Sequence, residues 1–176
     1  MESTAHEKLT ELWKIQQKRI EQWKITLLSA PKKLKESLEN SLGVSGLKCE
    51  DFLQDKVFDY VQIAGIDNRG KTVWQDPNGN WINDSGVLYF CILITFDHGP
   101  STLPKGTYRF SCKSKIDAEK TMYAFWDREA NEVKEDWSSS SEEFAEKIIQ
   151  SLESYLRIDP MNLSATPRKI GFITEI

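Results

Sequence analysis

The segment Gly65–Thr72, with the sequence GIDNRGKT, has the spacing of a phosphate-binding loop. In that motif a glycine-rich turn and the first amides of a following helix hold the phosphate oxygens, and a lysine reaches the outer phosphates. The residues after Lys71 soon run into Pro77 and Gly79, which leaves no room for such a helix. We therefore predict a hairpin instead of a nucleotide site, with Lys71 starting the returning strand.

Asp97 and Lys113 could belong to a metal-dependent nuclease of the restriction-enzyme type. That chemistry needs an acid at the end of one strand and an acid-x-Lys on the next, which together hold Mg²⁺ and orient water. Asp97 fits the first acid and Lys113 the lysine, but Ser111 stands where the second carboxylate belongs. A carboxylate would have to come from elsewhere, such as Glu11 or Glu21. An enzyme of this kind is the alternative hypothesis for function.

A calcium loop is the next metal site to weigh. Asp76, Asn78 and Asn80 have its first three ligand spacings, but Trp81 occupies the sixth position in place of Gly and Val87 the twelfth in place of Glu. The pattern therefore fits a polar turn better. We expect neither a metal site nor a cofactor.

Nucleophilic catalysis would have to use very few residues. The two histidines are His6, near the N-terminus, and His98, beside Gly-Pro in a turn-like segment. The three cysteines, Cys49, Cys91 and Cys112, are an odd number at wide spacing, which indicates neither a disulfide framework nor a metal knuckle. No catalytic triad is indicated, so we expect no catalytic residue outside the nuclease alternative.

Tryptophan is abundant, with six in 176 residues. Trp74, Trp81, Trp126 and Trp137 lie near predicted turns or element ends, where aromatic anchors for a partner often occur. The plainer alternative is that they cover the sheet edges against flanking helices. We take these four as the candidate partner-binding residues.

Composition indicates a folded, water-soluble chain. Apolar residues make up 39% of the sequence and charged residues 28%, and 23 basic against 27 acidic residues give a net charge of −4. This charge favours a protein partner over nucleic acid. The sequence has no stretch typical of a membrane span and no apolar signal core at its start, so we expect a cytoplasmic protein without a membrane contact.

The charge is unevenly placed along the chain. Residues 1–35 hold eight bases and four acids, a net +4, so the remainder carries −8. Residues 127–157 hold nine acids and four bases, a net −5. Such segments are typical of solvated helix faces, and the alternative is a basic helix that meets an acidic surface within one molecule or between two.

An N-terminal helix of about 20 residues is predicted by a stripe of residues at steps of four and three positions. The stripe consists of Leu9, Trp13, Gln16, Ile20, Trp23 and Leu27, of which only Gln16 is polar. Three heptads fit both a coiled-coil seam and a helix that lies on its own sheet, and both would bury Trp13 and Trp23. We expect packing on the chain's own sheet, with self-association as a homodimer through this helix as a further prediction.

Local signals predict the other helices. Pro31 suits the first turn of a second helix and Gly43 its end, so the chain opens with a helical hairpin. Serines ahead of Glu142 predict the start of a last helix, with Ser140 or Ser141 as its N-cap.

The middle of the chain predicts strands. From Val57 onward, β-branched and aromatic runs alternate with turn clusters, which favours antiparallel pairing. The nearly all-apolar run Val87–Phe96 predicts a central strand that is covered on both faces. Segment 117–130 fits either a strand or a helix, and we expect a strand.

The predicted fold class is α+β, with an N-terminal helical hairpin and a C-terminal helix packed on one mainly antiparallel sheet of four to six strands. We expect one domain over 1–176. Its parts are the helical hairpin 1–43, the sheet 57–128, the helix 139–157 and a tail 158–176 with a candidate edge strand. The function we expect is a non-catalytic binding protein, such as an accessory, inhibitor or immunity-type factor, that recognises a macromolecule through loop aromatics and an acidic surface.

Overall fold

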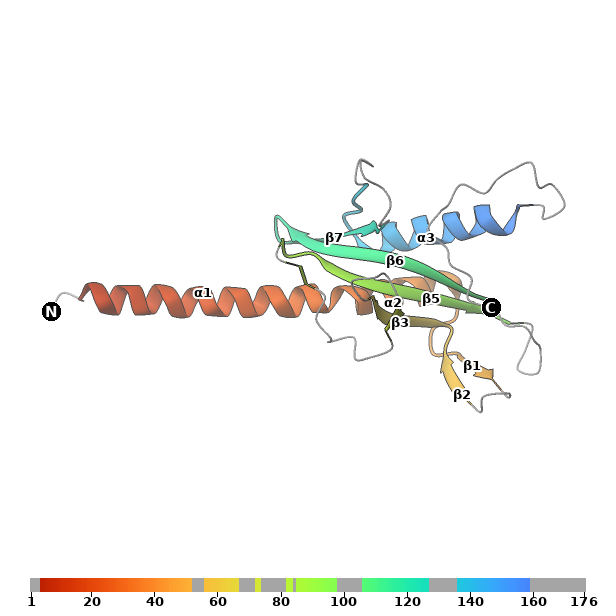
Figure 1. Cartoon of the computed structure of the whole chain (residues 1–176), viewed down its shortest axis with the longest axis horizontal. Coiled ribbons are helices and arrows are strands. Elements are labelled where there is room, and N and C mark those ends of the chain that lie inside the picture. Colours follow the sequence, from red (N-terminus) through yellow and green to blue (C-terminus); the bar gives the residue numbers. More distant parts are fainter. Residues whose placement is uncertain are drawn as a thin grey trace.

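The computed structural model describes residues 4–51, 56–66, 72–73, 82–83, 85–97, 106–126 and 136–158. The helices in this part of the chain are α1 (Ala5–Leu28), α2 (Ala30–Leu42) and α3 (Ser141–Leu156). The strands are β1 (Lys48–Asp51), β2 (Lys56–Asp59), β3 (Val61–Ile66), β4 (Thr72–Val73), β5 (Leu88–Phe96), β6 (Gly106–Asp117) and β7 (Lys120–Phe125). Figure 1 shows these elements, which confirm the predicted α+β class.

The main sheet is antiparallel throughout and has the strand order β4-β3-β5-β6-β7. β5 lies in the middle, and its residues Leu88 and Phe90–Thr95 are all buried, which confirms the predicted central strand. β1 and β2 form a separate two-stranded hairpin. The sequence therefore predicted the large sheet but not this small one.

The segment with phosphate-loop spacing takes part in a hairpin. Gly65 of β3 pairs with Val73 of β4, and Ile66 pairs with Thr72, so the chain returns as a strand and not as a helix. This pairing confirms the predicted antiparallel return. Residues 67–71, which include the predicted turn, lie outside the described part of the chain.

The ambiguous segment 117–130 is a strand as far as it is described. β6 ends at Asp117, the chain turns at Ala118 and Glu119, both with positive φ, and β7 then pairs back along β6. The prediction of a strand is therefore confirmed for Lys120–Phe125.

Helix boundaries follow the residues that predicted them. Pro31 lies in the first turn of α2, and Gly43 ends the helix in the left-handed conformation with φ 69°. The Ser140 side chain accepts a hydrogen bond from the backbone N–H of Glu143, so Ser140 is the N-cap of α3. Residues 159–176, with the candidate edge strand, lie outside the described part of the chain.

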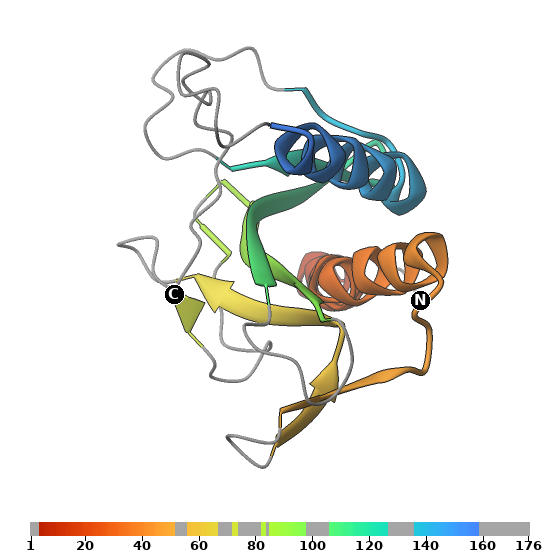
Figure 2. The same ribbon diagram turned by 90° about the vertical axis from the view of Figure 1, so that its right-hand side faces the viewer.

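One face of the sheet is covered by α2 and α3, which lie side by side in Figure 2. The helices contribute buried apolar side chains, and the sheet meets them with the alternate residues of its strands. The larger members of this core are Leu34, Leu38, Phe144, Ile148, Phe90, Ile92, Phe110 and Tyr123. The Tyr123 hydroxyl also donates a hydrogen bond of 3.3 Å to the carbonyl oxygen of Ala30. The core thus fixes both helices to the strands.

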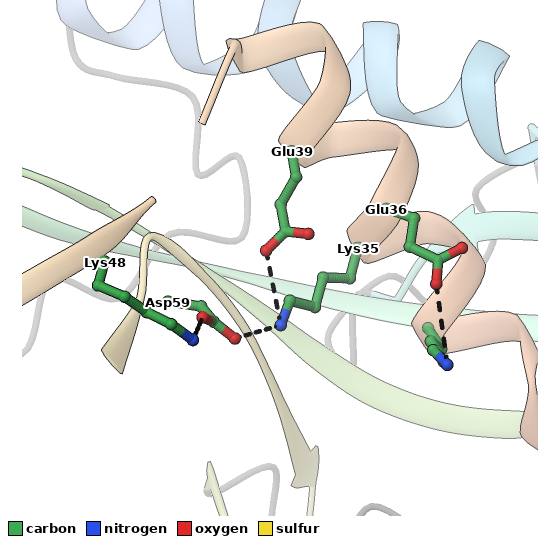
Figure 3. A network of polar contacts seen from close by, with 6 residues as sticks. Lys35, Glu36, Glu39, Lys48 and Asp59 are labelled. Atoms are coloured by element: carbon green, nitrogen blue, oxygen red, sulfur yellow. Dashed lines mark hydrogen bonds and ion pairs between the residues drawn. The ribbon is translucent and has the colours of Figure 1, made fainter. Parts of the chain in front are cut away.

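The β1–β2 hairpin is attached to α2 by a group of charged residues, shown in Figure 3. Lys35 Nζ lies 2.5 Å from Asp59 Oδ2 and 3.5 Å from Glu39 Oε1, and Lys48 also contacts Asp59. Hydrogen bonds from Lys35 and then from Lys48 lower the pKa of Asp59. Burial lowers the pKa of Lys35, but its hydrogen bond to Asp59 and the nearby acidic charges outweigh that effect and raise it.

α1 follows a different course from the one expected. Ser29 joins it to α2 without a loop, and Figure 1 shows most of α1 extending beyond the sheet. Leu27, at its C-terminal end, is fully buried, whereas Leu9 is 66% and Trp13 59% exposed. The expectation that the whole stripe lies on the chain's own sheet is therefore wrong for the outer turns. Helical spacing shows which residues share a face but not what covers them.

Candidate functional site

Asp97 lies directly after β5, where three separate segments meet. Its Oδ1 accepts a hydrogen bond of 3.1 Å from the Tyr60 hydroxyl, and Cys49 Sγ lies 3.4 Å from its Oδ2. Partial burial and the bond to Asp97 raise the pKa of Tyr60, so this hydroxyl stays a neutral donor. The carboxylate therefore ties the β1–β2 hairpin to the end of β5.

A small cavity of about 130 Å³ borders this cluster. Its lining is mostly apolar, with Leu42, Val44, Ile94 and Phe96 beside the polar Tyr60, Thr95 and Asp97. Among the described residues, no group of three His, Cys, Asp or Glu side chains is placed to hold a metal ion. The cluster is best explained as a structural contact.

Lys113 does not share a cleft with Asp97. In the β5–β6 register Lys113 pairs with Tyr89, near the start of β5, whereas Asp97 follows the end of that strand. Eight residues of extended strand separate the two positions, which corresponds to about 27 Å. The candidate donors Glu11 and Glu21 belong to α1. Asp97 and Lys113, the two residues on which the nuclease alternative depends, thus form no common site.

Lys113 instead contacts Trp137, together with Lys115. The two ammonium groups lie 5.2 Å and 4.4 Å from the centre of the Trp137 ring. Both lysines project from β6, and the chain beside Trp137 is held to β7 by the bridge between Ser138 and Tyr123. Cation–π contacts of this kind hold the indole ring on the sheet.

Trp126 is also engaged within the chain. It packs against the cluster of Ala64, Ile66, Cys91 and Leu93. Its ring makes an edge contact with Tyr89, at a centroid distance of 5.2 Å. The two predicted partner-binding residues that the structure describes, Trp126 and Trp137, therefore both have intramolecular contacts, and the other two, Trp74 and Trp81, lie outside the described residues.

The outer turns of α1 carry a different apolar surface. We define the α1 face as Leu9, Leu12, Trp13, Gln16 and Ile20. Leu12 is 62% and Ile20 39% exposed, and the apolar side chains of the α1 face follow one another along one side of the helix. The 4-3 spacing predicts this stripe without Leu12, which lies three residues after Leu9 and widens it.

The two ends of α1 are fixed in different ways. At the N-terminus Thr4 and Glu7 form a reciprocal capping box, in which each side chain accepts a hydrogen bond from the other's backbone N–H. At the other end Leu27 is buried in the core and Trp23 packs against it. The helix is thus capped where it is exposed and anchored where it enters the core, which presents the α1 face on a fixed element.

Known proteins add no functional information. Comparison with protein-family models, with curated proteins and with solved structures gives no match. None of the described helices has a stretch long and apolar enough to cross a membrane.

Proposed function

We propose that this protein is a non-catalytic binding protein, of the accessory, inhibitor or immunity type, and that the α1 face is its main contact with a protein partner. The observation that carries the proposal is the exposure of Leu9, Leu12 and Trp13, which are each about 60% exposed on one side of a capped helix. Large apolar patches on soluble proteins mark contact sites, because leaving them in water is unfavourable.

The chemistry of the face suits a protein partner. Trp is among the residues that contribute most to protein interfaces, and Leu and Ile beside it supply apolar area without a charge that would have to be desolvated. The partner must therefore offer an apolar surface that a helix can enter or lie against.

A second surface supports the same class of function. Five acids of the acidic segment 127–157 are described and exposed, namely Asp136, Glu142, Glu143, Glu146 and Glu153. Lys147 pairs with Glu143 and Asp136, so part of this charge is already balanced within the chain. We assign this surface a secondary role in steering association.

The test compares two double variants that remove exposed apolar side chains from different sides of α1. Leu9→Ser with Trp13→Ser changes the α1 face, whereas Ile15→Ser with Ile25→Ser changes exposed residues on other sides of the same helix. Tagged chains are purified from cells that also express a second, differently tagged copy, and stoichiometric partners are identified by mass spectrometry.

We expect a stoichiometric partner that is lost with the first double variant and kept with the second. Partners that respond equally to both pairs, or wild-type chains that retain no partner, would contradict the proposal. Circular dichroism of each variant shows whether α1 is still folded.

A further inference from the structure

The spacing along α1 is that of a two-helix seam. In heptad terms Leu9, Gln16 and Trp23 occupy d positions, and Trp13, Ile20 and Leu27 occupy a positions. A helix that docks in a groove needs apolar contact residues over one short stretch only. This stripe instead keeps its alternating steps of four and three residues from the exposed N-terminal turns of α1 to its buried C-terminal end. The natural complement of such a seam is another helix with the same spacing.

Only the outer part of the seam is open to another molecule. Trp23 and Leu27 already pack in the core of the same chain, so Leu9, Trp13, Gln16 and Ile20 remain. Resting on the proposed function, we propose that the partner of the α1 face is the α1 face of a second copy, in antiparallel orientation. This pairing places Leu9 opposite Ile20 and Trp13 opposite Gln16 of the second copy, so both chains use the four open positions alike.

The flanking charges favour the antiparallel orientation. In a parallel pair the g and e positions meet, which would bring Arg19 of each chain beside Lys24 of the other. In the antiparallel pair g meets g and e meets e, so Arg19 lies beside Leu12, and Thr10 lies beside Gln17. Two like-charge contacts are thereby avoided, and the exposed Leu12 is covered by the aliphatic part of an arginine.

The shape of the molecule agrees with this orientation. Figure 1 shows α1 extending to one side of the sheet, and its turns from Thr4 to Gln22 span about 28 Å at 1.5 Å per residue. An antiparallel pair places the two sheets at opposite ends of the paired helices, where they do not compete for space. Gln16 then lies beside the Trp13 indole N–H of the second copy, and a polar side chain within a seam specifies its register.

Sedimentation velocity on the full chain tests the self-association. We expect a species of twice 20.3 kDa that becomes dominant as the concentration rises. Trp13→Ala should weaken this association at least tenfold, whereas Ile25→Ala, on another side of α1, should leave it unchanged. A chain that stays monomeric at roughly 100 μM, well above the micromolar constant expected for a small interface, would overturn the inference.

Disulfide trapping tests the orientation. Chains with Leu12→Cys mixed with chains with Arg19→Cys should cross-link if the pair is antiparallel, whereas Leu12→Cys with Gln17→Cys should cross-link if it is parallel. The native thiols of Cys49, Cys91 and Cys112 are buried, so they do not compete under native conditions. Cross-linking of the parallel combination alone would overturn the orientation.

The outcomes separate this inference from the proposed function. The purified chain could instead be monomeric and retain a different stoichiometric protein in cells, one that is lost with the Leu9 and Trp13 double variant. That result would overturn the pairing with a second copy and leave the proposed function standing. A monomer whose α1 face instead binds vesicles of phosphatidylcholine and phosphatidylglycerol, and retains no protein, would overturn both.

Discussion

Leu9 and Leu27 offer a direct comparison of the two ends of α1. They are 18 residues apart, which is five complete helical turns, so both lie on the same side of the helix. Leu27 is fully buried and Leu9 is 66% exposed. Leu→Ala can therefore be compared at two positions of the same stripe, one packed within the chain (Leu27) and one exposed to water (Leu9).

We expect the two substitutions to change the free energy of unfolding by very different amounts. Leu27→Ala removes buried methyl groups from the core and leaves a cavity, which destabilises proteins by about 2–5 kcal/mol. Leu9→Ala removes a side chain that is largely in water, and alanine favours the helix slightly, so its effect should stay within about 0.5 kcal/mol. With a urea dependence of about 2 kcal/mol per M, Leu27→Ala should lower the midpoint by about 1–2.5 M.

The assay is urea unfolding followed by far-UV circular dichroism at low protein concentration. Because self-association stabilises a folded chain by mass action, the wild type should gain stability as the concentration rises, and Leu9→Ala should lose that gain. Equal destabilisation by the two substitutions at low concentration would refute the reasoning, since it would mean that Leu9 is packed within the chain.

Three further predictions concern the sheet and its attachments. Asp59→Asn should destabilise the chain at neutral pH. Because the folded-state pKa of Asp59 lies below its ordinary 3.8, the ionised carboxylate contributes fully to the stability of the fold above that value, and this contribution is lost as the pH falls further. Wild type and variant should therefore converge in acid unfolding curves. Gly86→Ala should lower the melting temperature by several degrees, because Gly86 has a φ of 75° and the added Cβ would lie 3.1 Å from the Trp23 ring. An unchanged melting temperature would contradict this contact. Trp137→Ala should cost about 1–2 kcal/mol in urea unfolding by removing two cation–π contacts, whereas Trp137→Phe should retain part of them.

Local signals in the sequence were sufficient for most elements. Pro31, Gly43 and Ser140 act through their own backbone geometry or through hydrogen bonds within one turn, so their positions predicted the limits of α2 and α3. β5 was predicted as the central strand because only a strand covered on both faces needs so continuous an apolar run.

Contacts between distant segments could not be predicted in this way. The link between Asp97, Tyr60 and Cys49 joins three elements, and their separation in sequence gives no sign of it. Trp137 was predicted to contact a partner, but the β6–β7 hairpin and its bridge to Ser138 bring two lysines of β6 over its ring. Periodicity likewise predicted the stripe that includes Trp13 but could not show that its outer turns pass beyond the sheet.

Photo-crosslinking from α1 in living cells tests the central claim most directly. A benzophenone amino acid is placed at Trp13, on the α1 face, and in a matched chain at Ile25, which is 57% exposed on another side of the helix. We predict a discrete protein adduct from position 13, which mass spectrometry assigns to a second copy of the chain, and little or none from position 25. Absence of any adduct from position 13, or equal adducts from both positions, would contradict the account.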